Sequence, residues 1–345
     1  MFKFLKYPFY SLVSYVLKSR FFRSEIWYAI SDFFGISPLP SSLKYYSNPY
    51  YNYDFTSFRE LILKKKPLFI TGRFRSGSTF LWLIFRNTPG ITAYYEPLNE
   101  NRWFLSNKFR VDPTHRGVND YSSEYQGLDY LNKFFQQSWT YRKLYMTEKD
   151  YDANLFHYLF SLILASPSRP VLQFNRIDFR LPWIKANFPG VPILHIIRNP
   201  RDQWISVMRD SYVPPDFIIE SSDNLSLFYT IPWAQDLKKV FPFLEPIGQH
   251  PYKIHYFLWR LSYIFGVTYS DYTIKYEHLC SNFEEEVRKI FDCFRIPYDD
   301  SLVKELSLLN KPPSLNKWHS YASPEWFSSI ESECERILFS FFKKQ

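Results

Sequence analysis

Short apolar runs alternate with stretches of helical periodicity over most of the chain. The apolar runs are typical of strands buried on both faces of a sheet, and they cover residues 67–71, 91–95, 169–174, 191–197 and 272–276. Apolar positions spaced as on one face of a helix occur at residues 78–87, 152–164, 200–210, 252–266 and 282–295. This alternation predicts an α/β fold in which helices flank a mainly parallel central sheet.

Two segments fall outside this alternation. Residues 99–168 show no clear strand, and we expect a helical insertion on the substrate side. Residues 1–66 precede the first strand, beginning with an aromatic and basic stretch and continuing into a Pro- and Ser-rich connector at 37–54. The predicted organisation is therefore an N-terminal helical extension over 1–66 and a main domain over 67–345.

The composition favours a globular protein that binds anions. Its 42 Lys and Arg residues exceed its 34 Asp and Glu residues, giving a formal net charge of +8. This excess suits nucleotides, acidic glycans or anionic membranes. Nucleic acid is disfavoured, since the charge is spread and no nucleic-acid motif occurs. The three cysteines form no C-x-x-C pair and the seven histidines are scattered, so we expect reduced thiols and no metal site.

The N-terminal stretch limits where the protein can reside. Its longest uncharged run, Tyr7 to Leu17, has 11 residues, whereas a bilayer span needs about 20. Lysines and arginines flank apolar positions here, so residues 1–30 suit either an interfacial amphipathic helix or a helix packed on the main domain. We expect a cytoplasmic protein, with peripheral membrane contact through residues 1–30 as one option.

The stretch GRFRSGST at residues 72–79 resembles a nucleotide-binding P-loop but lacks its lysine. The P-loop pattern is G-x-x-x-x-G-K-[ST]; here Ser78 stands in place of the lysine, and a cation appears earlier as Arg75. Such a turn between strand and helix directs backbone N–H groups and the positive helix end at one point. The stretch can hold a phosphate-type group, and the alternative is a serine-rich turn with a surface arginine.

A second anion site is predicted in ILHIIRNPRDQWISVMRD, residues 193–210. The strand ends at Arg198, Asn199 can cap the following helix, and Pro200 fits its first turn. Ser206 falls about two turns into that helix. The alternative for Arg198 is a salt bridge with Asp202. Two anion sites at the ends of two strands indicate a ligand with two phosphate-type groups.

Together these two stretches resemble the nucleotide-binding motifs of sulfotransferases that use 3′-phosphoadenosine 5′-phosphosulfate (PAPS). The resemblance implies a P-loop nucleoside triphosphate hydrolase-like fold. It assigns the 3′-phosphate to Arg198 and Ser206. It assigns the 5′-phosphosulfate to the residues of the loop, which are Arg75, Ser76, Gly77, Ser78 and Thr79. An arginine in this loop is more similar to the carbohydrate and tyrosylprotein branch than to the aryl branch, which has lysine.

Further stretches extend the resemblance over residues 67–320. YYEPL (94–98) looks like the Y-E-P segment of the carbohydrate branch. IKYEHL (274–279) resembles a Y-E-D-L segment whose tyrosine, here Tyr276, contacts adenine. SLNKWHSY (314–321) resembles a G-K-W-R segment that closes over the nucleotide, which implicates Lys317 and Trp318. Phe80 takes the place of a tryptophan that stacks on adenine in the family.

Glu96 is the predicted general base. It follows the second strand, and Pro97 keeps it extended, so it lies at the edge of the sheet where the loop opens. Its spacing from Arg75 resembles that of the glutamate-base sulfotransferases. The alternatives are a structural carboxylate paired with Arg73 or Arg75, or His115 as the base in the manner of the aryl branch.

Other residues with functional side chains receive weaker assignments. Arg176 follows the third strand and could contact a ligand or form a salt bridge, whereas His195 lies inside an apolar strand and reads as core.

The resemblance implies in-line sulfuryl transfer from PAPS to a hydroxyl group, with catalytic Arg75 and Glu96 and without a metal. The carbohydrate-type motifs favour a carbohydrate acceptor, and an alcohol on a lipid or a secondary metabolite is the alternative. A phosphotransferase using ATP is disfavoured because the lysine after Gly77 is missing. A non-catalytic nucleotide- or glycan-binding protein on the same fold is the rival from another class.

Overall fold

The computed structural model describes residues 55–105, 110–208, 212–221, 227–310 and 315–344. The chain divides into two compact units, Met1–Phe55 and Thr56–Gln345, and nearly all described residues belong to the second. The interfacial helix expected within residues 1–30 lies outside the described residues. In the part that the structure describes, no helix combines the length and apolar character needed to cross a membrane.

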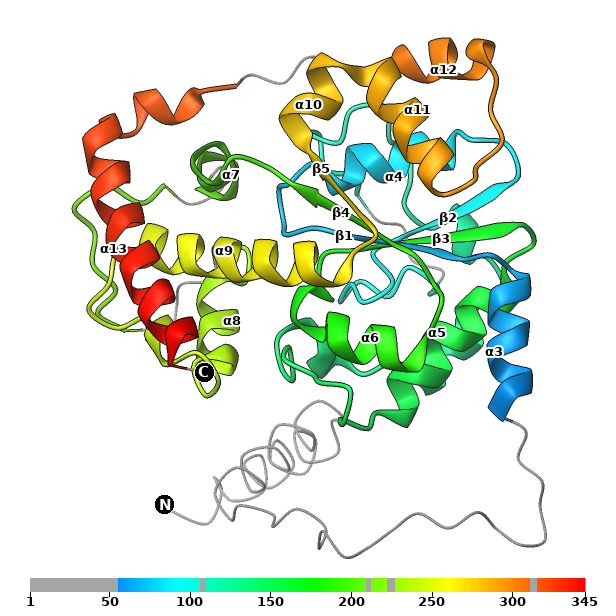
Figure 1. The fold of residues 1–345 in the computed structure, drawn as a ribbon, viewed down its shortest axis with the longest axis horizontal. Coiled ribbons are helices and arrows are strands. Elements are labelled where there is room, and N and C mark those ends of the chain that lie inside the picture. Colours follow the sequence, from blue (N-terminus) through cyan, green and yellow to red (C-terminus); the bar gives the residue numbers. More distant parts are fainter. Residues whose placement is uncertain (1–54, 106–109, 209–211, 222–226, 311–314, 345) are drawn as a thin grey trace, which may run out of the picture. The chain divides into compact units, whose positions relative to one another are not determined.

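A five-stranded parallel sheet forms the centre of the second unit (Figure 1), with the strand order β2-β3-β1-β4-β5. The strands are β1 (Leu68–Thr71), β2 (Ile91–Tyr95), β3 (Arg169–Phe174), β4 (Ile193–Ile197) and β5 (Tyr272–Lys275). Phe69 of β1 pairs with Leu172 of β3 on one side and Ile193 of β4 on the other. The predicted fold class and all five predicted strands are confirmed, although Tyr276 begins a helix instead of ending β5.

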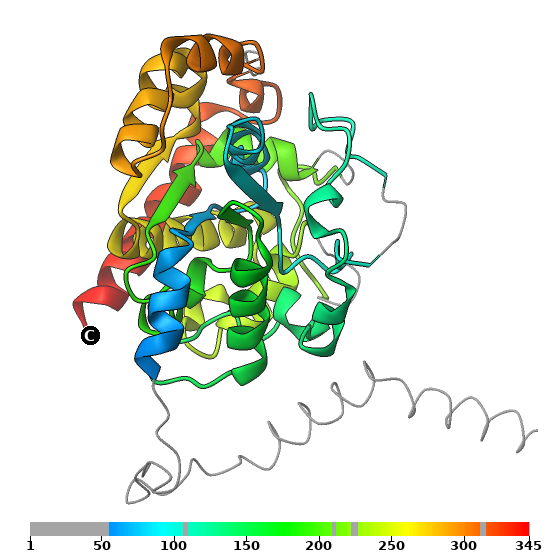
Figure 2. The same cartoon turned by 90° about the vertical axis from the view of Figure 1, so that its right-hand side faces the viewer.

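Helices cover both faces of this sheet. Figures 1 and 2 show α4, α10 and α11 on one side and α3, α5 and α6 on the other. The helices are α3 (Phe55–Lys64), α4 (Ser78–Arg86), α5 (Ala153–Ala165), α6 (Leu181–Asn187), α7 (Pro200–Val207), α8 (Thr230–Leu237), α9 (Pro251–Tyr269), α10 (Tyr276–Ser281), α11 (Phe283–Cys293), α12 (Asp300–Ser307) and α13 (Pro324–Lys343). Covering both faces explains why the strands read as mostly apolar runs.

The segment 99–168 differs from the helical insertion expected there. Its described part before α5 contains only 3₁₀ turns, at Ser123–Tyr125, Asp129–Lys133 and Gln137–Thr140, and α5 is the crossover helix between β2 and β3. The segment is held instead by single aromatic anchors, since Tyr125 and Trp139 are each 1% exposed. Such anchors have no helical spacing, so the sequence pattern did not reveal them.

Helix α3 belongs to the second unit, although the predicted domain boundary at residue 66 lies after it. Ile62 is buried in the core cluster around the sheet. Phe58 meets Phe160 of α5 with ring centroids 5.3 Å apart, and the Lys65 Nζ donates to the Ser166 carbonyl at 2.7 Å. The division into compact units therefore places the boundary near residue 55.

His195 is a core residue, in agreement with the sequence analysis. Its side chain lies between β4 and α9, where a Cβ on Gly266 would come within 2.2 Å of the ring. Only glycine allows this close approach of helix and strand. Burial lowers the pKa of His195 to about 4, so the ring is neutral at physiological pH.

Candidate active site

The site lies where the loops after β1, β2, β3 and β4 meet at one edge of the sheet. Parallel strands bring their carboxyl ends together, and ligands bind in the crevice outside them. A cavity of about 1380 Å³ opens there. Ten of the predicted site residues line it, namely Arg75, Gly77, Ser78, Thr79, Phe80, Glu96, Arg198, Ser206, Tyr276 and Lys317.

Gly77 shapes the loop between β1 and α4. It caps α4 with φ 94°, a left-handed conformation that favours glycine. A Cβ at this position would lie 2.2 Å from the Tyr276 ring, so only glycine lets the loop and the ring approach. The N-terminus of α4 therefore faces the cavity with its backbone N–H groups, as an anion site requires.

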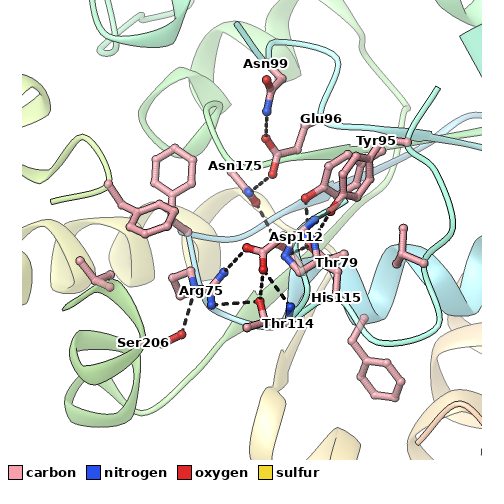
Figure 3. A pocket seen from close by; sticks show the side chains of 18 of the residues that line it. Arg75, Thr79, Tyr95, Glu96, Asn99, Asp112, Thr114, His115, Asn175 and Ser206 are labelled. Carbon is pink, nitrogen blue, oxygen red and sulfur yellow. Dashed lines mark hydrogen bonds and ion pairs between the residues drawn. The ribbon is translucent and has the colours of Figure 1, made fainter. Parts of the chain in front are cut away.

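Arg75 connects the loop to two other segments (Figure 3). Its Nε donates to the Ser206 hydroxyl at 2.8 Å, and its NH2 donates to the Thr114 hydroxyl at 3.3 Å. Its NH1 lies 3.4 Å from the Asp112 carboxylate. The cation of the first motif thus contacts the serine of the second motif directly, so both predicted anion sites belong to one cavity.

Arg198 lies at the end of β4, as predicted. Its guanidinium stacks on the Tyr276 ring with 5.0 Å to the centroid, and its NH1 donates to the Arg75 carbonyl at 3.2 Å. Its Nε is buried without a hydrogen-bond partner among the described residues. The alternative partner, Asp202, instead accepts from the backbone N–H groups of Asn316 and Lys317, each at 3.1 Å.

Glu96 is 6% exposed, and its φ of 37° is left-handed instead of the extended conformation predicted before Pro97. Its carboxylate is held at both oxygens. Oε2 accepts from Asn99 at 2.6 Å and from the Arg176 guanidinium at 2.8 Å. Oε1 accepts from the Asn175 amide, as Figure 3 shows for both asparagines. Glu96 therefore pairs with Arg176 and not with Arg73 or Arg75, and Arg176 also pairs with Glu100.

His115 lies inside the same cavity. Its Nε2 is 3.5 Å from the Thr79 hydroxyl, and its Nδ1 is 2.6 Å from the Tyr121 hydroxyl. The Thr79 hydroxyl is also 3.1 Å from the Tyr95 hydroxyl. Burial, followed by the charge of Glu96, raises the pKa of Tyr95 well above its usual value. His115 is thus anchored beside the loop, where it stays a second candidate for the base.

The comparison with protein families agrees with this geometry. Residues 67–217, which contain both anion-binding motifs and Glu96, match the model of the sulfotransferase family. This match assigns residues 67–217 to the sulfotransferase family. The match supports a PAPS-dependent sulfotransferase, and it leaves the branch within the family open.

Three solved sulfotransferase structures are similar to this sulfotransferase. Sulfotransferase STF9 from Mycobacterium avium shares 13% identity, with 79% of this chain and 78% of that chain covered and a TM-score of 0.43. Mouse sulfotransferase SULT7A1 complexed with PAP shares 14%, with 80% and 89% covered and a TM-score of 0.41. The sulfotransferase domain from the curacin biosynthetic pathway shares 14%, with 78% and 96% covered and a TM-score of 0.39. No curated protein sequence matches this chain significantly.

Two predicted site residues of this sulfotransferase lie away from the cavity. Ser76 is 1% exposed and lines a small cavity behind the loop with Arg73. Its backbone N–H donates to the Arg73 carbonyl at 3.1 Å. Trp318 is buried in a hydrophobic core cluster separate from the one around the sheet, and the Arg201 guanidinium lies 4.6 Å from its ring. Lys317 next to it does line the cavity.

Several residues of the site were missed in the sequence analysis. Asn175 follows β3 directly, next to Arg176, which the sequence analysis did single out, and that position was a usable signal because all parallel strands end at this edge. Asp112 and Thr114 lie in a segment without periodicity. Phe228 also lines the cavity, and no sequence signal points to it.

The cavity wall includes a strained turn before α8. Leu227, Phe228 and Tyr229 have φ values of 42°, 50° and 64°. Each is left-handed, which costs a non-glycine residue about 1–2 kcal/mol. The Arg75 guanidinium lies 5.4 Å from the Phe228 ring, and the Arg176 guanidinium lies 5.4 Å from the Tyr229 ring. The turn therefore presents two aromatic rings to the charged groups of the site.

The residues present fit a nucleotide with phosphate groups at both ends. The left-handed Gly77 opens the loop towards the cavity, and the buried, unpartnered Nε of Arg198 offers a donor to an anion. Among the described residues, no group of three or more His, Cys, Asp or Glu side chains is arranged to hold a metal ion. That the reaction needs no metal stays a prediction.

Proposed function

We propose that this sulfotransferase transfers the sulfuryl group of PAPS to a carbohydrate hydroxyl, with Glu96 as the general base. One observation carries the proposal: Glu96, directly after β2, and Arg75, in the loop after β1, line one cavity. A base for the acceptor and a cation for the leaving group are thereby available in the same space. Both are requirements of an in-line displacement on sulfur.

PAPS supplies an activated sulfuryl group, and the residues of the two motifs are suited to hold it. Arg75 and the N-terminus of α4 would bind the phosphosulfate, while Arg198 and Ser206 would bind the 3′-phosphate. Phe80, Tyr276 and Lys317 line the same cavity and would hold the adenosine. Arg75 would also stabilise negative charge on the leaving oxygen, since a guanidinium donates several N–H bonds in a fixed fork.

Glu96 retains room to accept a proton. A carboxylate offers about four acceptor sites, and three donors occupy three of them. Among the hydrogen bonds of the described residues, Oε2 accepts two and Oε1 accepts that of Asn175. The acceptor's proton would therefore go to Oε1.

The wall beyond Glu96 suits a sugar. It combines the rings of Trp103, Phe228 and Tyr229 with the polar groups of Asn99 and Asn101. Aromatic faces beside polar side chains are typical of sites that bind amphipathic rings. An alcohol on a lipid or secondary metabolite could use the same base, so both classes belong in the acceptor test.

The substitution Glu96→Gln tests the base. The amide keeps the shape but cannot accept the proton, so turnover should fall by roughly 10²–10⁴. Affinity for 3′-phosphoadenosine 5′-phosphate (PAP), measured by calorimetry, should stay close to that of the wild type. The control is His115→Ala, which should change turnover little. Near-normal turnover in Glu96→Gln together with a large loss in His115→Ala would transfer the role of base to His115.

Labelled PAPS distinguishes the acceptor classes and the non-catalytic rival. The protein is incubated with [³⁵S]PAPS and, separately, with pooled oligosaccharides and with pooled lipid and metabolite alcohols. We expect label in the oligosaccharide pool. Label in the alcohol pool alone would identify the other acceptor class, and PAP binding without any transfer would favour a binding protein.

A cytoplasmic location also belongs to this proposal. It rests on the cysteine pattern and on the short apolar runs of residues 1–30. Cell fractionation followed by a carbonate wash is the test, and we expect the protein to leave the membrane fraction. Retention after carbonate would contradict the proposal.

A further inference from the structure

Asn175 lies between Glu96 and the phosphate-binding loop. It follows β3, is 5% exposed and lines the cavity. Its Nδ2 donates to Oε1 of Glu96. Its Oδ1 accepts from the Ser78 hydroxyl and from the Gln173 amide, each at 2.8 Å. Figure 3 shows it beside the Glu96 carboxylate.

The contacts of Asn175 fix the orientation of its amide. An ionised carboxylate only accepts hydrogen bonds, so Nδ2 must face Glu96. Oδ1 then faces Ser78, and because a carbonyl oxygen only accepts, the Ser78 hydroxyl must be the donor. Gln173, which is 0% exposed, donates to the same oxygen and restrains the amide further. Glu96 therefore determines, through Asn175, where the single Ser78 hydrogen points.

We propose that Asn175 is a positioning residue for sulfuryl transfer that couples the loop to the base. The Ser78 hydroxyl has one hydrogen, so donating it to an anion on the loop means withdrawing it from Asn175. Asn175 then keeps its bonds to Gln173 and Glu96, and the Oε1 that takes the proton stays aimed into the cavity. The proposal rests on the assignment of Glu96 as base.

Asn99 provides a matched control. Its Nδ2 also donates to Glu96, at 2.6 Å and on Oε2, and it is 8% exposed. Its Oδ1 accepts from the backbone of Asn101 at 2.9 Å, on the side away from Ser78. Replacing Asn99 thus removes a donor to the same carboxylate without altering the partner of Ser78.

The first test is a double-mutant cycle in which calorimetry measures the affinity for PAP. In the wild type, PAP competes with Asn175 for the Ser78 hydrogen, and in Asn175→Ala this competition is removed. Ser78→Ala should therefore weaken PAP binding about fivefold more in the Asn175→Ala background than in the wild type. In the Asn99→Ala background its effect should match that in the wild type. Equal effects of Ser78→Ala in all three backgrounds would overturn the coupling.

The second test separates positioning from damage to the fold. Single-turnover transfer of label from [³⁵S]PAPS to the acceptor pool that accepts it should fall about 10–100-fold in Asn175→Ala, while PAP binding is not weakened. Undiminished transfer in Asn175→Ala would overturn the proposal. Undiminished transfer in Glu96→Gln would instead refute the base, so the two failures are distinguishable.

The variant Asn175→Asp adds a pH readout. It keeps an acceptor for Ser78 but sets a second carboxyl against Glu96, and two adjoining carboxyls hold one proton between them. Protonated, the new side chain again donates to Glu96. Transfer by this variant should therefore recover as the pH falls from about 7 to 5, whereas transfer by Asn175→Ala should show no such recovery. The same pH dependence in both variants would contradict the role of the donor at this position.

Discussion

Arg198 has the most directly testable role among the single residues. Its buried Nε and its position over Tyr276 suit a 3′-phosphate. Arg198→Ala should weaken PAP binding by about 1.5–3 kcal/mol, the usual contribution of a charged hydrogen bond. AMP, which lacks the 3′-phosphate, is the control ligand, and its weaker binding should barely change. Calorimetry measures the affinity for both ligands. Equal losses of affinity for PAP and AMP would show that Arg198 does not bind the 3′-phosphate.

Asp112 competes with an anionic ligand for the guanidinium of Arg75. Its carboxylate lies 3.4 Å from the guanidinium, with the two side chains 23% and 12% exposed, and an anionic ligand needs the same cation. Asp112→Asn should tighten PAP binding by about 0.2–1 kcal/mol, the range for pairs of this kind. The control is Asp120→Asn, which removes an ion pair with Arg86. Weaker PAP binding in Asp112→Asn would show that Asp112 instead positions Arg75.

The sequence predicts the charged groups of the site better than their partners. Glu96 and Arg198 directly follow strands, which are visible as apolar runs followed by polar residues, and Arg75 lies in the glycine-containing loop after β1. Asp112 reaches Arg75 from a segment whose backbone follows no period. Contacts of that kind depend on how a loop packs, which local patterns do not encode.

At the scale of elements, the close contact between α9 and β4 predicts that Gly266→Ala lowers the stability of the protein. Alanine in place of glycine inside a helix normally stabilises by about 1 kcal/mol. In Gly266→Ala the new Cβ would meet the His195 ring at 2.2 Å, and overpacking of this kind costs about 1–3 kcal/mol. We expect a net loss of stability in urea unfolding. The same substitution in a His195→Ala background should be neutral or stabilising, and a loss there too would indicate another cause.

The elements also show where prediction from sequence ends. All five strands are confirmed because a parallel sheet covered on both faces favours apolar residues at most positions of each strand. Asn199 accepts from the backbone N–H of Arg201, and Pro200 opens α7, as their residue types indicate. The segment before α5 has no regular pattern of buried apolar positions, and the residues that anchor it, such as Trp139, are single side chains.

For the whole molecule, the two most deeply buried histidines predict sensitivity to acid. Burial lowers the pKa of His195 to about 4 and that of His255 to about 3, whereas an unfolded histidine titrates near 6.5. Below pH 6.5 the unfolded chain therefore binds more protons, and stability falls with falling pH. Between pH 7 and 5 each should cost about 2 kcal/mol.

Urea unfolding at a series of pH values measures this effect. His195→Gln should flatten the slope of stability against pH, whatever it does to stability at pH 7. His278, which is exposed, supplies the control, since His278→Gln should leave the slope unchanged. An unchanged slope in His195→Gln would show that other groups cause the acid sensitivity.

The left-handed turn at Leu227 to Tyr229 has a consequence for redesign. Substitutions that reshape a binding wall usually lower stability, but here the wall is already strained at three successive residues. Glycine at Phe228 would relieve part of that strain while removing a ring from the cavity. A library of variants at this turn could therefore explore new acceptors with little loss of folded protein, which makes it the natural first place to redirect the enzyme.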